Sequence, residues 1–562
     1  MTNSQQRRLW IVVAGLVLAT AVIITRLIVF QIVQGREWAD KLVDEASVVA
    51  KPERGVILDR NGAVLAANTA EYRIGVSPAL VDDPQALATA LTGILQIPLY
   101  DILTDLTTTS SYQVLASPVS NEIAQAVAAL DENALRIEPL PRRFYPQDDM
   151  MCHTLGFLNF DGEGLAGLEA FYESELAGEA ASARVKISPL EVQKSVVARE
   201  GADVVLTIDR SVQHLVEQHL ADALTTHGAT SGEIIVMDPR TGAILALASL
   251  PCYDLSADSS LVDPFVGRQY EPGSVMKLIT MAAALDSGTV TSDSTYYDAG
   301  ALEVGGHRTV NWDRSAPGTV DMTTLLSRSL NVGAATLATW MGAESYYNYM
   351  GQFSFGRITG VDLAGETGGL MPLPGSPFWI ESYLATNSYG QALAVTPMQM
   401  ILSVSALAND GKIMQPHIVQ EIRGEENTLV HQPTIYSQPI SAQTAQQVTT
   451  MAITAVAREV SAAQVPGYTI AGKTGTAQIP DPITKGYHPT DVIGSFIGWL
   501  PADDPQLLIL VKIDRPTSAP WGSQTAAPVF ADLAEDLVVL LNIPPDSFRL
   551  QADLAAYNNN SP

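Results

Sequence analysis

The chain has 562 residues, of which 47% are hydrophobic and 16% charged, and its formal net charge is −28. A chain of this length is expected to form about two to four domains with large hydrophobic cores, which excludes an intrinsically disordered protein. The excess of acidic residues repels a phosphate backbone, so nucleic acid is excluded as a partner.

The first segment of the chain is apolar. Leu9–Val33 corresponds to a helix of roughly 37 Å, which is long enough to cross the hydrocarbon core of a membrane. Arg7 and Arg8 precede it and predict that residues 1–8 are cytoplasmic and that the rest of the chain is outside. The alternative is a cleaved signal peptide, because Ala19–Ala21 resembles a cleavage site. The apolar run continues past that site, which favours an uncleaved anchor over residues 9–33.

An N-terminal domain is expected over residues 34–228. In it, Arg54–Gly62 predicts a short strand that ends in an Asn-Gly turn. Alternating β-rich and helical segments follow to about residue 200, so we expect an α+β or β-rich class.

A second domain is expected over residues 229–545. Two β-hairpins enclose a helical middle part, which predicts an antiparallel sheet flanked by helices and therefore the α+β class. The tail over residues 546–562 is expected to be disordered. The predicted hairpin strands are Glu233–Met237 with Ala243–Leu250 and Ser495–Leu500 with Gln506–Ile513, and the predicted helical regions are Ser274–Asp286, Thr323–Met341 and Phe530–Leu541.

The two cysteines, Cys152 and Cys252, lie far apart in the sequence and have no metal-ligand spacing, so no metal site is expected. A core of this size needs no disulfide framework. Both are therefore interpreted as small packing residues, with a bridge between them as the less favoured alternative.

Three short motifs carry the predicted chemistry. Ser274 and Lys277 form an S-x-x-K pair on one face of a predicted helix, where a neutral amine can take the proton of the hydroxyl. Ser329 and Asn331 form an S-x-N triplet in the second helical region. Lys473 opens a K-T-G-T sequence in a β-compatible stretch. S-x-x-K alone is common, but the three motifs in this order are typical of one active-serine domain.

The residues after Lys473 predict a binding strand. The hydroxyls of Thr474 and Thr476 can bind a substrate carboxylate, which the charge of Lys473 attracts. Gly475 is expected to let the ligand approach the strand edge closely.

In this order the motifs resemble those of the penicillin-binding protein and serine β-lactamase superfamily, and the surrounding sequence resembles the class B penicillin-binding proteins. The resemblance spans nearly the whole chain, from the anchor to about residue 540. The upstream part resembles the N-terminal pedestal, or dimerisation, domain of that class. The stretches that carry it are Tyr270–Gly273, Phe355–Gly356, Thr359–Gly360, Gly390–Gln391, Thr396–Pro397 and Ala526–Phe530, and upstream Arg54–Gly62, Arg143, Tyr145–Pro146, Gly164–Glu169 and Tyr172.

The resemblance implies a serine-type D,D-transpeptidase of peptidoglycan that needs no cofactor. By this resemblance, Ser274 is expected to attack the penultimate carbonyl of a stem peptide ending in D-Ala-D-Ala, with Lys277 as the base. Ser329, helped by Lys473, is expected to relay a proton to the leaving nitrogen, and Asn331 to bind the substrate amide. The resemblance also implies an oxyanion hole formed by the backbone N–H groups of Ser274 and Thr476.

The implied partners are peptidoglycan stem peptides, β-lactams as covalent inhibitors, and a membrane glycan polymerase of the SEDS type. Division is favoured over side-wall elongation, because Ser495–Pro505 and Ala526–Phe530 resemble division or sporulation types. Two other functions stay open, a β-lactamase and a catalytically silent scaffold of the wall machinery. The anchor and the pedestal disfavour the first, and the intact motif residues disfavour the second.

Overall fold

The structure is a computed structural model that describes residues 3–29, 45–50, 52–159, 161–186, 198–253, 261–481 and 483–551. By its internal packing the chain divides into two compact units. One contains residues 1–53 and 178–201, and the other contains residues 54–177 and 202–562.

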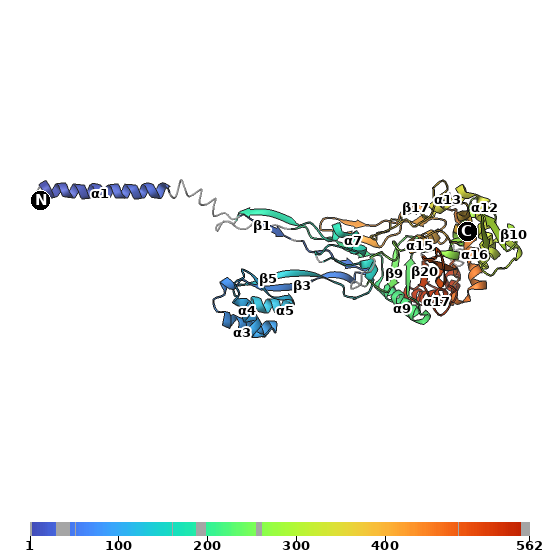
Figure 1. The fold of residues 1–562 in the computed structure, drawn as a ribbon, viewed down its shortest axis with the longest axis horizontal. Coiled ribbons are helices and arrows are strands. Elements are labelled where there is room, and N and C mark those ends of the chain that lie inside the picture. The colour runs from blue at the N-terminus through green and yellow to red at the C-terminus, as the bar shows by residue number, and fades with distance from the viewer. Residues whose placement is uncertain are drawn as a thin grey trace, which may run out of the picture. The chain divides into compact units, whose positions relative to one another are not determined.

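The first unit contains one long helix and a two-stranded antiparallel ribbon. The helix is α1 (Asn3–Ile28), and the ribbon pairs β1 (Glu45–Ala50) with β6 (Ala181–Lys186) (Figure 1). Within α1, Trp10–Ile28 has a mean hydropathy of 2.5, which is apolar enough to span a membrane. Residues 30–33 of the predicted anchor lie outside the described residues.

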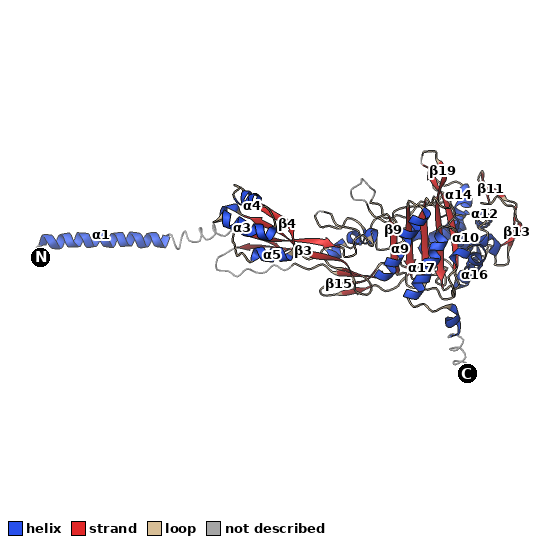
Figure 2. Ribbon diagram, turned by 90° about the horizontal axis from the view of Figure 1, so that it is seen from below, coloured by secondary structure: helices blue, strands red, loops and turns tan. Residues whose placement is uncertain are grey.

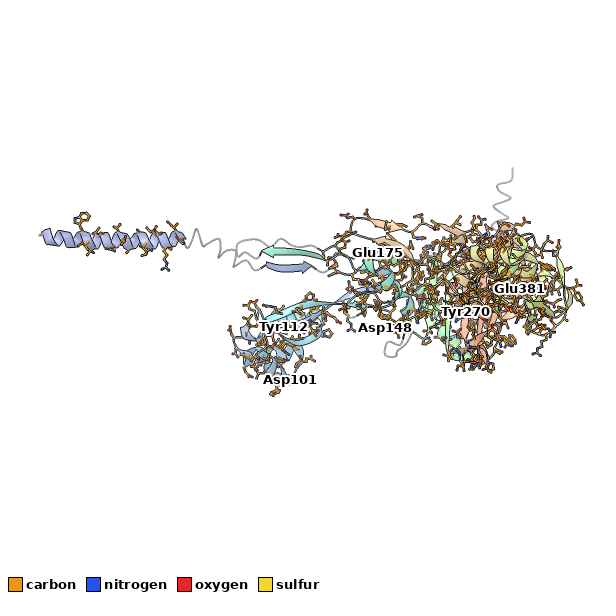
Figure 3. The ribbon with its side chains drawn as sticks, turned by 45° about the horizontal axis from the view of Figure 1, so that its top comes forward. Asp101, Tyr112, Asp148, Glu175, Tyr270 and Glu381 are labelled. Carbon is orange, nitrogen blue, oxygen red and sulfur yellow. A yellow bond between two sulfur atoms is a disulfide. The ribbon has the colours of Figure 1, made fainter. Side chains whose placement is uncertain are left out.

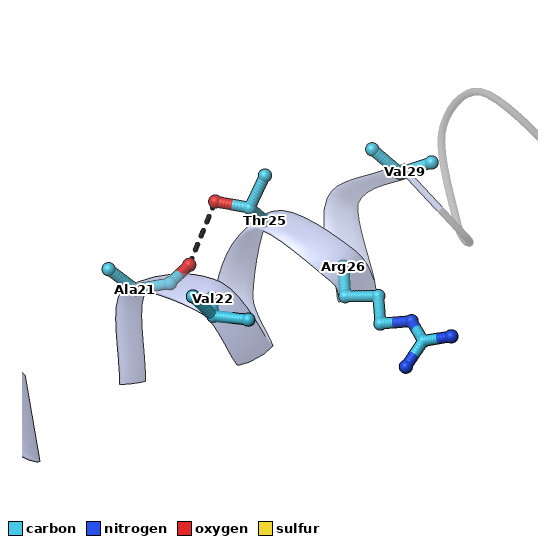
Figure 4. A pocket seen from close by; sticks show the side chains of 5 residues that line it. All are labelled: Ala21, Val22, Thr25, Arg26 and Val29. Atoms are coloured by element: carbon cyan, nitrogen blue, oxygen red, sulfur yellow. Dashed lines mark hydrogen bonds between the residues drawn. The ribbon is translucent and has the colours of Figure 1, made fainter. Parts of the chain in front are cut away.

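Two polar side chains near the C-terminal end of α1 suit an apolar environment. The Thr25 hydroxyl donates a hydrogen bond of 2.8 Å to the carbonyl of Ala21, one turn earlier, and Arg26 extends outward from the helix (Figure 4). A hydroxyl that is satisfied within its own helix needs no other partner inside a bilayer, and a long cationic side chain can reach the polar interface.

In the second unit, a mixed sheet lies in the N-terminal part. Within the described residues its strands run in the order β16-β15-β7-β2-β3-β4, with β5 paired to β3. Two of these strands, β15 and β16, come from the second half of the chain. The bounds are β2 (Ile57–Leu58), β3 (Val64–Val76), β4 (Gln113–Val119), β5 (Leu135–Phe144), β7 (Asp203–Leu206), β15 (Val419–Arg423) and β16 (Thr428–Val430).

Three helices cover the far end of β3, β4 and β5, as Figure 1 shows. They are α3 (Pro84–Leu95), α4 (Leu99–Leu106) and α5 (Asn121–Ala128), and their apolar side chains, including Leu91 and Ile102, form a separate small core with the strands. Tyr112, labelled in Figure 3, precedes β4 and donates a hydrogen bond of 3.1 Å to Glu138 of β5.

A buried carboxylate ties this N-terminal part together. Glu169 lies in α7 (Gly167–Phe171) and is fully buried. Its two oxygens pair with Arg54 at 2.7 Å and with Arg143 at 2.6 Å. Arg143 also donates to the carbonyl of Gly55 at 2.8 Å. The three stretches of the predicted pedestal therefore converge on one ionic cluster.

The predicted turn at the end of Arg54–Gly62 is confirmed. The Asp59 carboxylate accepts hydrogen bonds from the N–H groups of Asn61 at 2.9 Å and Ala63 at 2.7 Å. Gly62 adopts a φ of 85°, a left-handed conformation that glycine reaches without a steric cost.

Cys152 and Cys252 form a disulfide bond, so the interpretation of both as packing thiols is wrong. Cys152 begins α6 (Cys152–Leu155), and Cys252 follows the strand β9 (Ile244–Leu250). The fold brings together two residues whose separation of 100 positions carries no pairing information. A second link between the same two parts of the chain is the hydrogen bond of 2.9 Å from the Tyr172 hydroxyl to Asp362.

The expected antiparallel sheet forms the centre of the C-terminal part. Within the described residues it has five strands in the order β18-β19-β20-β8-β9. They are β8 (Ser231–Met237), β9 (Ile244–Leu250), β18 (Ala471–Asp481), β19 (Gly486–Leu500) and β20 (Leu507–Asp514). The two predicted hairpins are confirmed, although β19 begins nine residues earlier than the predicted Ser495–Leu500.

Both faces of this sheet are buried. Ile234 and Val236 pack into a core with α9 (Arg210–His227) and α17 (Ala526–Leu540), which Figure 2 shows over one face. Ile235 and Met237 point into the larger core on the other face. Strands covered on both sides have continuous apolar runs, which explains why these strands were predictable.

The larger core is formed with the remaining helices. They are α10 (Met276–Asp286), α11 (Met322–Ser327), α12 (Asn331–Met341), α13 (Ala343–Gln352), α14 (Ser382–Ser388), α15 (Pro397–Ser405) and α16 (Ala442–Glu459). Small antiparallel pairs lie at its periphery, namely β10 (Thr295–Asp298) with β13 (Gly318–Asp321), β11 (Ala301–Val304) with β12 (His307–Val310), and β14 (Ile413–Met414) with β17 (Ile435–Ser437).

The disordered tail was predicted to begin at residue 546, which is too early in the chain. Residues 546–551 are helical, and Arg549 pairs with Asp503 and Asp546, each at 2.6 Å. An ion pair to an earlier loop holds this turn in place. Residues 552–562 lie outside the described residues.

The ionic cluster around Glu169 makes a prediction about stability. The change Glu169→Gln removes the carboxylate that pairs with the buried guanidinium of Arg143 and leaves Arg54 paired with Glu173, which is expected to cost about 3–5 kcal/mol of unfolding free energy. The matched control is Glu425→Gln in the exposed turn between β15 and β16, where about 0.5 kcal/mol or less is expected. Denaturant unfolding of the detergent-solubilised protein measures both, and equal midpoints for the two variants would contradict the role of Glu169.

Candidate active site

Ser274 and Lys277 lie at the start of α10. Gly273 has a φ of 57° and begins a short 3₁₀ turn over Gly273–Val275, which continues into the helix at Met276. Helical spacing then places the Lys277 amine 2.8 Å from the Ser274 hydroxyl oxygen, as the sequence predicted. The serine is partly exposed and the lysine is 1% exposed, so the hydroxyl faces the surface and the amine lies behind it.

Ser329 and Asn331 approach the same amine from another segment. The Lys277 nitrogen lies 2.7 Å from Asn331 Oδ1, 2.9 Å from the Ser329 carbonyl oxygen and 3.1 Å from the Ser329 hydroxyl. The sequence predicted one helical region over Thr323–Met341 that contains the S-x-N triplet. The structure shows that this region is interrupted at the triplet. Helix α11 ends at Ser327 and α12 begins at Asn331.

The break between these helices has a conformational cause. Ser329 has a φ of 57°, which is uncommon for a residue with a Cβ and persists only where surrounding contacts hold it. This conformation directs both the carbonyl and the hydroxyl of Ser329 toward Lys277. A helical Ser329 would direct its carbonyl along the helix axis instead.

Lys473 lies on β18, as predicted. Alternation along the strand buries Lys473, Gly475 and Ala477 and leaves Thr474 and Thr476 partly exposed on the opposite face. The Lys473 amine contacts the carbonyl of Thr474 at 3.2 Å. Burial lowers the pKa of Lys473 to about 8.

The pKa of Lys277 is shifted more strongly. Burial, and then the positive charge of Lys473, hold it well below the ordinary value of 10.5. The oxygens around the amine are uncharged, so they hydrogen-bond to it but add no negative charge that would favour the ammonium form. The site therefore favours a neutral amine next to Ser274.

Backbone segments approach one another closely around these side chains. A Cβ on Gly390 would lie 2.1 Å from the Gly273 carbonyl oxygen, and one on Gly522 would lie 2.2 Å from that of Gly475. The N–H of Gly522 also donates a hydrogen bond of 3.1 Å to the Thr476 hydroxyl. Sequence reasoning missed Gly522, which no motif marks.

Gly475 has a packing role that the sequence did not indicate. A Cβ at this position would lie 2.3 Å from the Ser495 hydroxyl and 3.0 Å from the Pro272 carbonyl oxygen. Protein atoms therefore fill the space on the side where a Cβ of residue 475 would project. The glycine lets β18 pack against β19 and against the segment that carries the nucleophile.

A buried ionic group on the central sheet contacts the segment that precedes Ser274. Lys512 of β20 pairs with Glu233 at 2.7 Å and Asp514 at 2.6 Å, and its amine lies 5.1 Å from the ring centre of Tyr270. Tyr270, labelled in Figure 3, is buried four residues before Ser274. A cation over an aromatic ring adds an attractive contact that fixes the ring against the sheet.

The structure therefore brings Ser274, Ser329 and Asn331 within hydrogen-bonding distance of the Lys277 amine, and Lys473 acts on that amine through its charge. Within the described residues, no group of three or more His, Cys, Asp or Glu side chains is placed to hold a metal ion.

Comparison with known families assigns both parts of the chain. Residues 232–535 match the model of the penicillin-binding protein transpeptidase domain, and residues 49–206 match that of the penicillin-binding protein dimerisation domain. The chain belongs to the penicillin-binding protein transpeptidase family. The three motifs, the sheet and the N-terminal domain are thus those of a class B penicillin-binding protein, whose catalytic part is a D,D-transpeptidase domain.

Individual relatives resemble the chain over most of its length. Stage V sporulation protein D of Bacillus subtilis is 34% identical, with 97% of this chain and 88% of the relative covered. The peptidoglycan D,D-transpeptidase FtsI homolog of Mesostigma viride is 28% identical, with 94% of each covered. Among solved structures, penicillin-binding protein 3 of Mycobacterium tuberculosis in complex with aztreonam has a TM-score of 0.69 and 29% identity, covering 89% of this chain and 98% of that one.

Proposed function

We propose that this penicillin-binding protein cross-links peptidoglycan through an acyl-enzyme on Ser274. The observation that carries the proposal is the buried Lys277 amine, 2.8 Å from the Ser274 hydroxyl, in a setting that lowers its pKa. A neutral amine there takes the serine proton as the oxygen attacks the penultimate carbonyl of a D-Ala-D-Ala stem peptide.

The hydrogen-bond geometry supports a neutral amine in this role. A neutral amine has two N–H donors and one lone pair. The carbonyl of Ser329 and the Oδ1 of Asn331 can only accept, so they take the two donors. The lone pair is then left for the hydroxyl of Ser274.

The other motif residues receive roles that complete the reaction. Ser329 relays the proton from Lys277 to the leaving D-Ala nitrogen. The positive charge of Lys473 acts on the Lys277 amine and so assists this transfer. The Nδ2 of Asn331 already donates to the Val310 carbonyl at 3.1 Å, which orients the amide toward a substrate backbone. Thr474, Gly475 and Thr476 form the strand that binds the substrate carboxylate. Backbone N–H groups of Ser274 and Thr476 stabilise the oxyanion.

β-Lactams are expected to acylate the same serine, and the related structure in complex with aztreonam supports this expectation. Fluorescent penicillin should label the chain once, and Ser274→Ala should abolish the label. Ser287→Ala, at the exposed end of α10, is the matched control and should keep it. Gel fluorescence and peptide mass mapping measure the adduct, and a label that survives Ser274→Ala would refute the assignment.

The lifetime of the same adduct separates the proposal from a β-lactamase. Class A β-lactamases use a glutamate between the S-x-N and K-T-G motifs, in an E-x-x-L-N setting, to activate water. Between Asn331 and Lys473, Glu381–Ala385 comes nearest to that pattern and ends in alanine. A β-lactamase with an ordinary turnover number would lose the label within about a second. Such a rapid loss would therefore favour a β-lactamase over the proposed transpeptidase.

The lowered pKa of Lys277 predicts an unusual pH dependence. Because the base form is present above the lowered pKa, the rate of penicillin acylation should rise with pH at low values and level off well below 10.5. A lysine of ordinary pKa would instead give a rate that rises about tenfold per pH unit up to that value. Lys277→Arg puts a permanently protonated guanidinium in place of the neutral amine, so it cannot take the serine proton and should lower acylation by about a hundredfold or more. Unchanged acylation of Lys277→Arg would exclude the lysine as base.

The disulfide supports the proposal that the catalytic domain is outside the cytoplasmic membrane and residues 1–8 are inside. Disulfides persist in oxidising compartments and are rare in the cytosol. Protease added to spheroplasts should digest the bulk of the chain and leave the anchor. A maleimide reagent should label Cys152 and Cys252 of the denatured protein only after reduction. A soluble mature chain that begins near Val22 would show a cleaved signal peptide instead.

We further propose a role in septal synthesis, with a SEDS-type glycan polymerase as the membrane partner. The relatives named for sporulation and for the FtsI homolog support a division-type enzyme over an elongation-type one. Depletion in cells separates the two roles, because loss of septal synthesis gives filaments and loss of side-wall synthesis gives rounded cells.

A further inference from the structure

Glu271 has a carboxylate held in place three residues before the nucleophile. One of its oxygens accepts a hydrogen bond of 3.0 Å from the N–H of Ala392. The hydroxyl of Tyr487 lies 3.2 Å from that oxygen and 3.0 Å from the other. Residues from two distant segments thus fix a partly buried acid whose role the S-x-x-K, S-x-N and K-T-G motifs do not define.

The carboxylate lies between the strand of the K-T-G motif and the segment that supports the S-x-N motif. Tyr487 belongs to β19 and is paired with Pro480, on the same strand as Thr476. On the other side, the charge of Glu271 acts on Tyr389, whose hydroxyl lies 3.3 Å from that of Thr309. The residue after Thr309 is Val310, which accepts the hydrogen bond from Asn331.

The backbone holds Glu271 close to the reacting groups. The N–H of Gly273 donates a hydrogen bond of 3.0 Å to the Gly390 carbonyl, and a Cβ on Gly273 would lie 2.9 Å from the Thr476 carbonyl oxygen. The segment from Glu271 to Ser274 is therefore clamped between β18 and the loop that carries Ala392.

The environment of Glu271 suits proton exchange at neutral pH. Burial raises its pKa to about 7, although the hydrogen bonds from Ala392 and Tyr487 act in the opposite direction. The titratable groups that face it are Tyr487 from β19 and Tyr389 from the end of α14, and both are neutral phenols near pH 7. Because these facing groups carry no positive charge, the carboxyl group of Glu271 is not held in its ionised form. It can therefore both lose and take up a proton near pH 7.

The second half of the proposed reaction needs such a group. The acceptor amine arrives as an ammonium ion, which has no lone pair for attack on the acyl ester. One proton must leave before the C–N bond forms, a second returns to the Ser274 oxygen as the C–O bond breaks, and the third stays on the new amide. Lys277 can deliver the second proton, but the first needs a different acceptor.

We propose that Glu271 is the catalytic base that takes the first proton from the acceptor ammonium. This inference rests on the proposed transpeptidase function and assigns a residue to its second step. The carboxylate becomes a carboxylic acid before the amine attacks, and it returns the proton to water after the product leaves. Tyr487 and Ala392 are positioning groups that hold the carboxylate by their hydrogen bonds.

The test compares aminolysis and hydrolysis of the same acyl-enzyme. The full-length protein in detergent receives a thioester donor whose acyl group ends in D-Ala, with glycine amide as the acceptor. For Glu271→Gln, which keeps the shape of the side chain, the ratio of aminolysis to hydrolysis at neutral pH should fall by about a hundredfold. Glu425→Gln, an exposed control, should give the ratio of the unchanged protein.

A second variant covers the case in which Glu271→Gln does not fold. Tyr487→Phe keeps the carboxylate and removes a donor that lowers its pKa, so the midpoint of the aminolysis profile should move to higher pH. An aminolysis ratio within about twofold of the unchanged protein for Glu271→Gln, or an unmoved midpoint for Tyr487→Phe, would overturn the inference. Failure of the unchanged protein to bind penicillin would overturn the transpeptidase function itself, so the two failures are distinguishable.

Discussion

The active site depends on burying a primary amine among uncharged oxygens. Lys277 is enclosed in the larger core, where the neutral form is favoured because the charged form loses its hydration. The unfolded chain binds a proton at this lysine at any pH below about 10.5, so the burial lowers folding stability progressively as the pH falls below that value. Three separate segments, α10, the break before α12 and β18, enclose the amine.

The two-sided sheet makes this enclosure possible. Because β8, β19 and β20 are covered on both faces, helix α10, which follows Ser274, lies in a fully formed interior while β18 remains at the sheet edge. The nucleophile is then supported from below by Tyr270 and Lys512, and from the side by the close approach of Gly273 to Gly390. Rigid support of this kind keeps catalytic side chains in a reactive geometry without relying on mobile loops.

Much of the fold and of the site could be predicted from the sequence, because the relevant signals are local. The spacing of Ser274 and Lys277, the apolar runs of the central strands and the turn at Asn61–Gly62 each depend on a few neighbouring residues. The left-handed Ser329 was missed because only tertiary contacts with Lys277 make that conformation favourable. The disulfide and the packing reason for Gly475 were missed for the same reason, since their partners are distant in the chain.

The shared sheet of the N-terminal part limits how the chain can be divided. Strand β15 (Val419–Arg423) comes from within the transpeptidase match but hydrogen-bonds to β7 (Asp203–Leu206), which comes from the dimerisation match. A truncated protein that starts at residue 229 would retain β15 without its neighbour and would expose an unpaired strand edge, a common starting point for aggregation. For expression, crystallisation or inhibitor screening, a soluble fragment that resists aggregation should therefore begin before Arg54. Such a fragment contains β2 and β7, which complete that sheet.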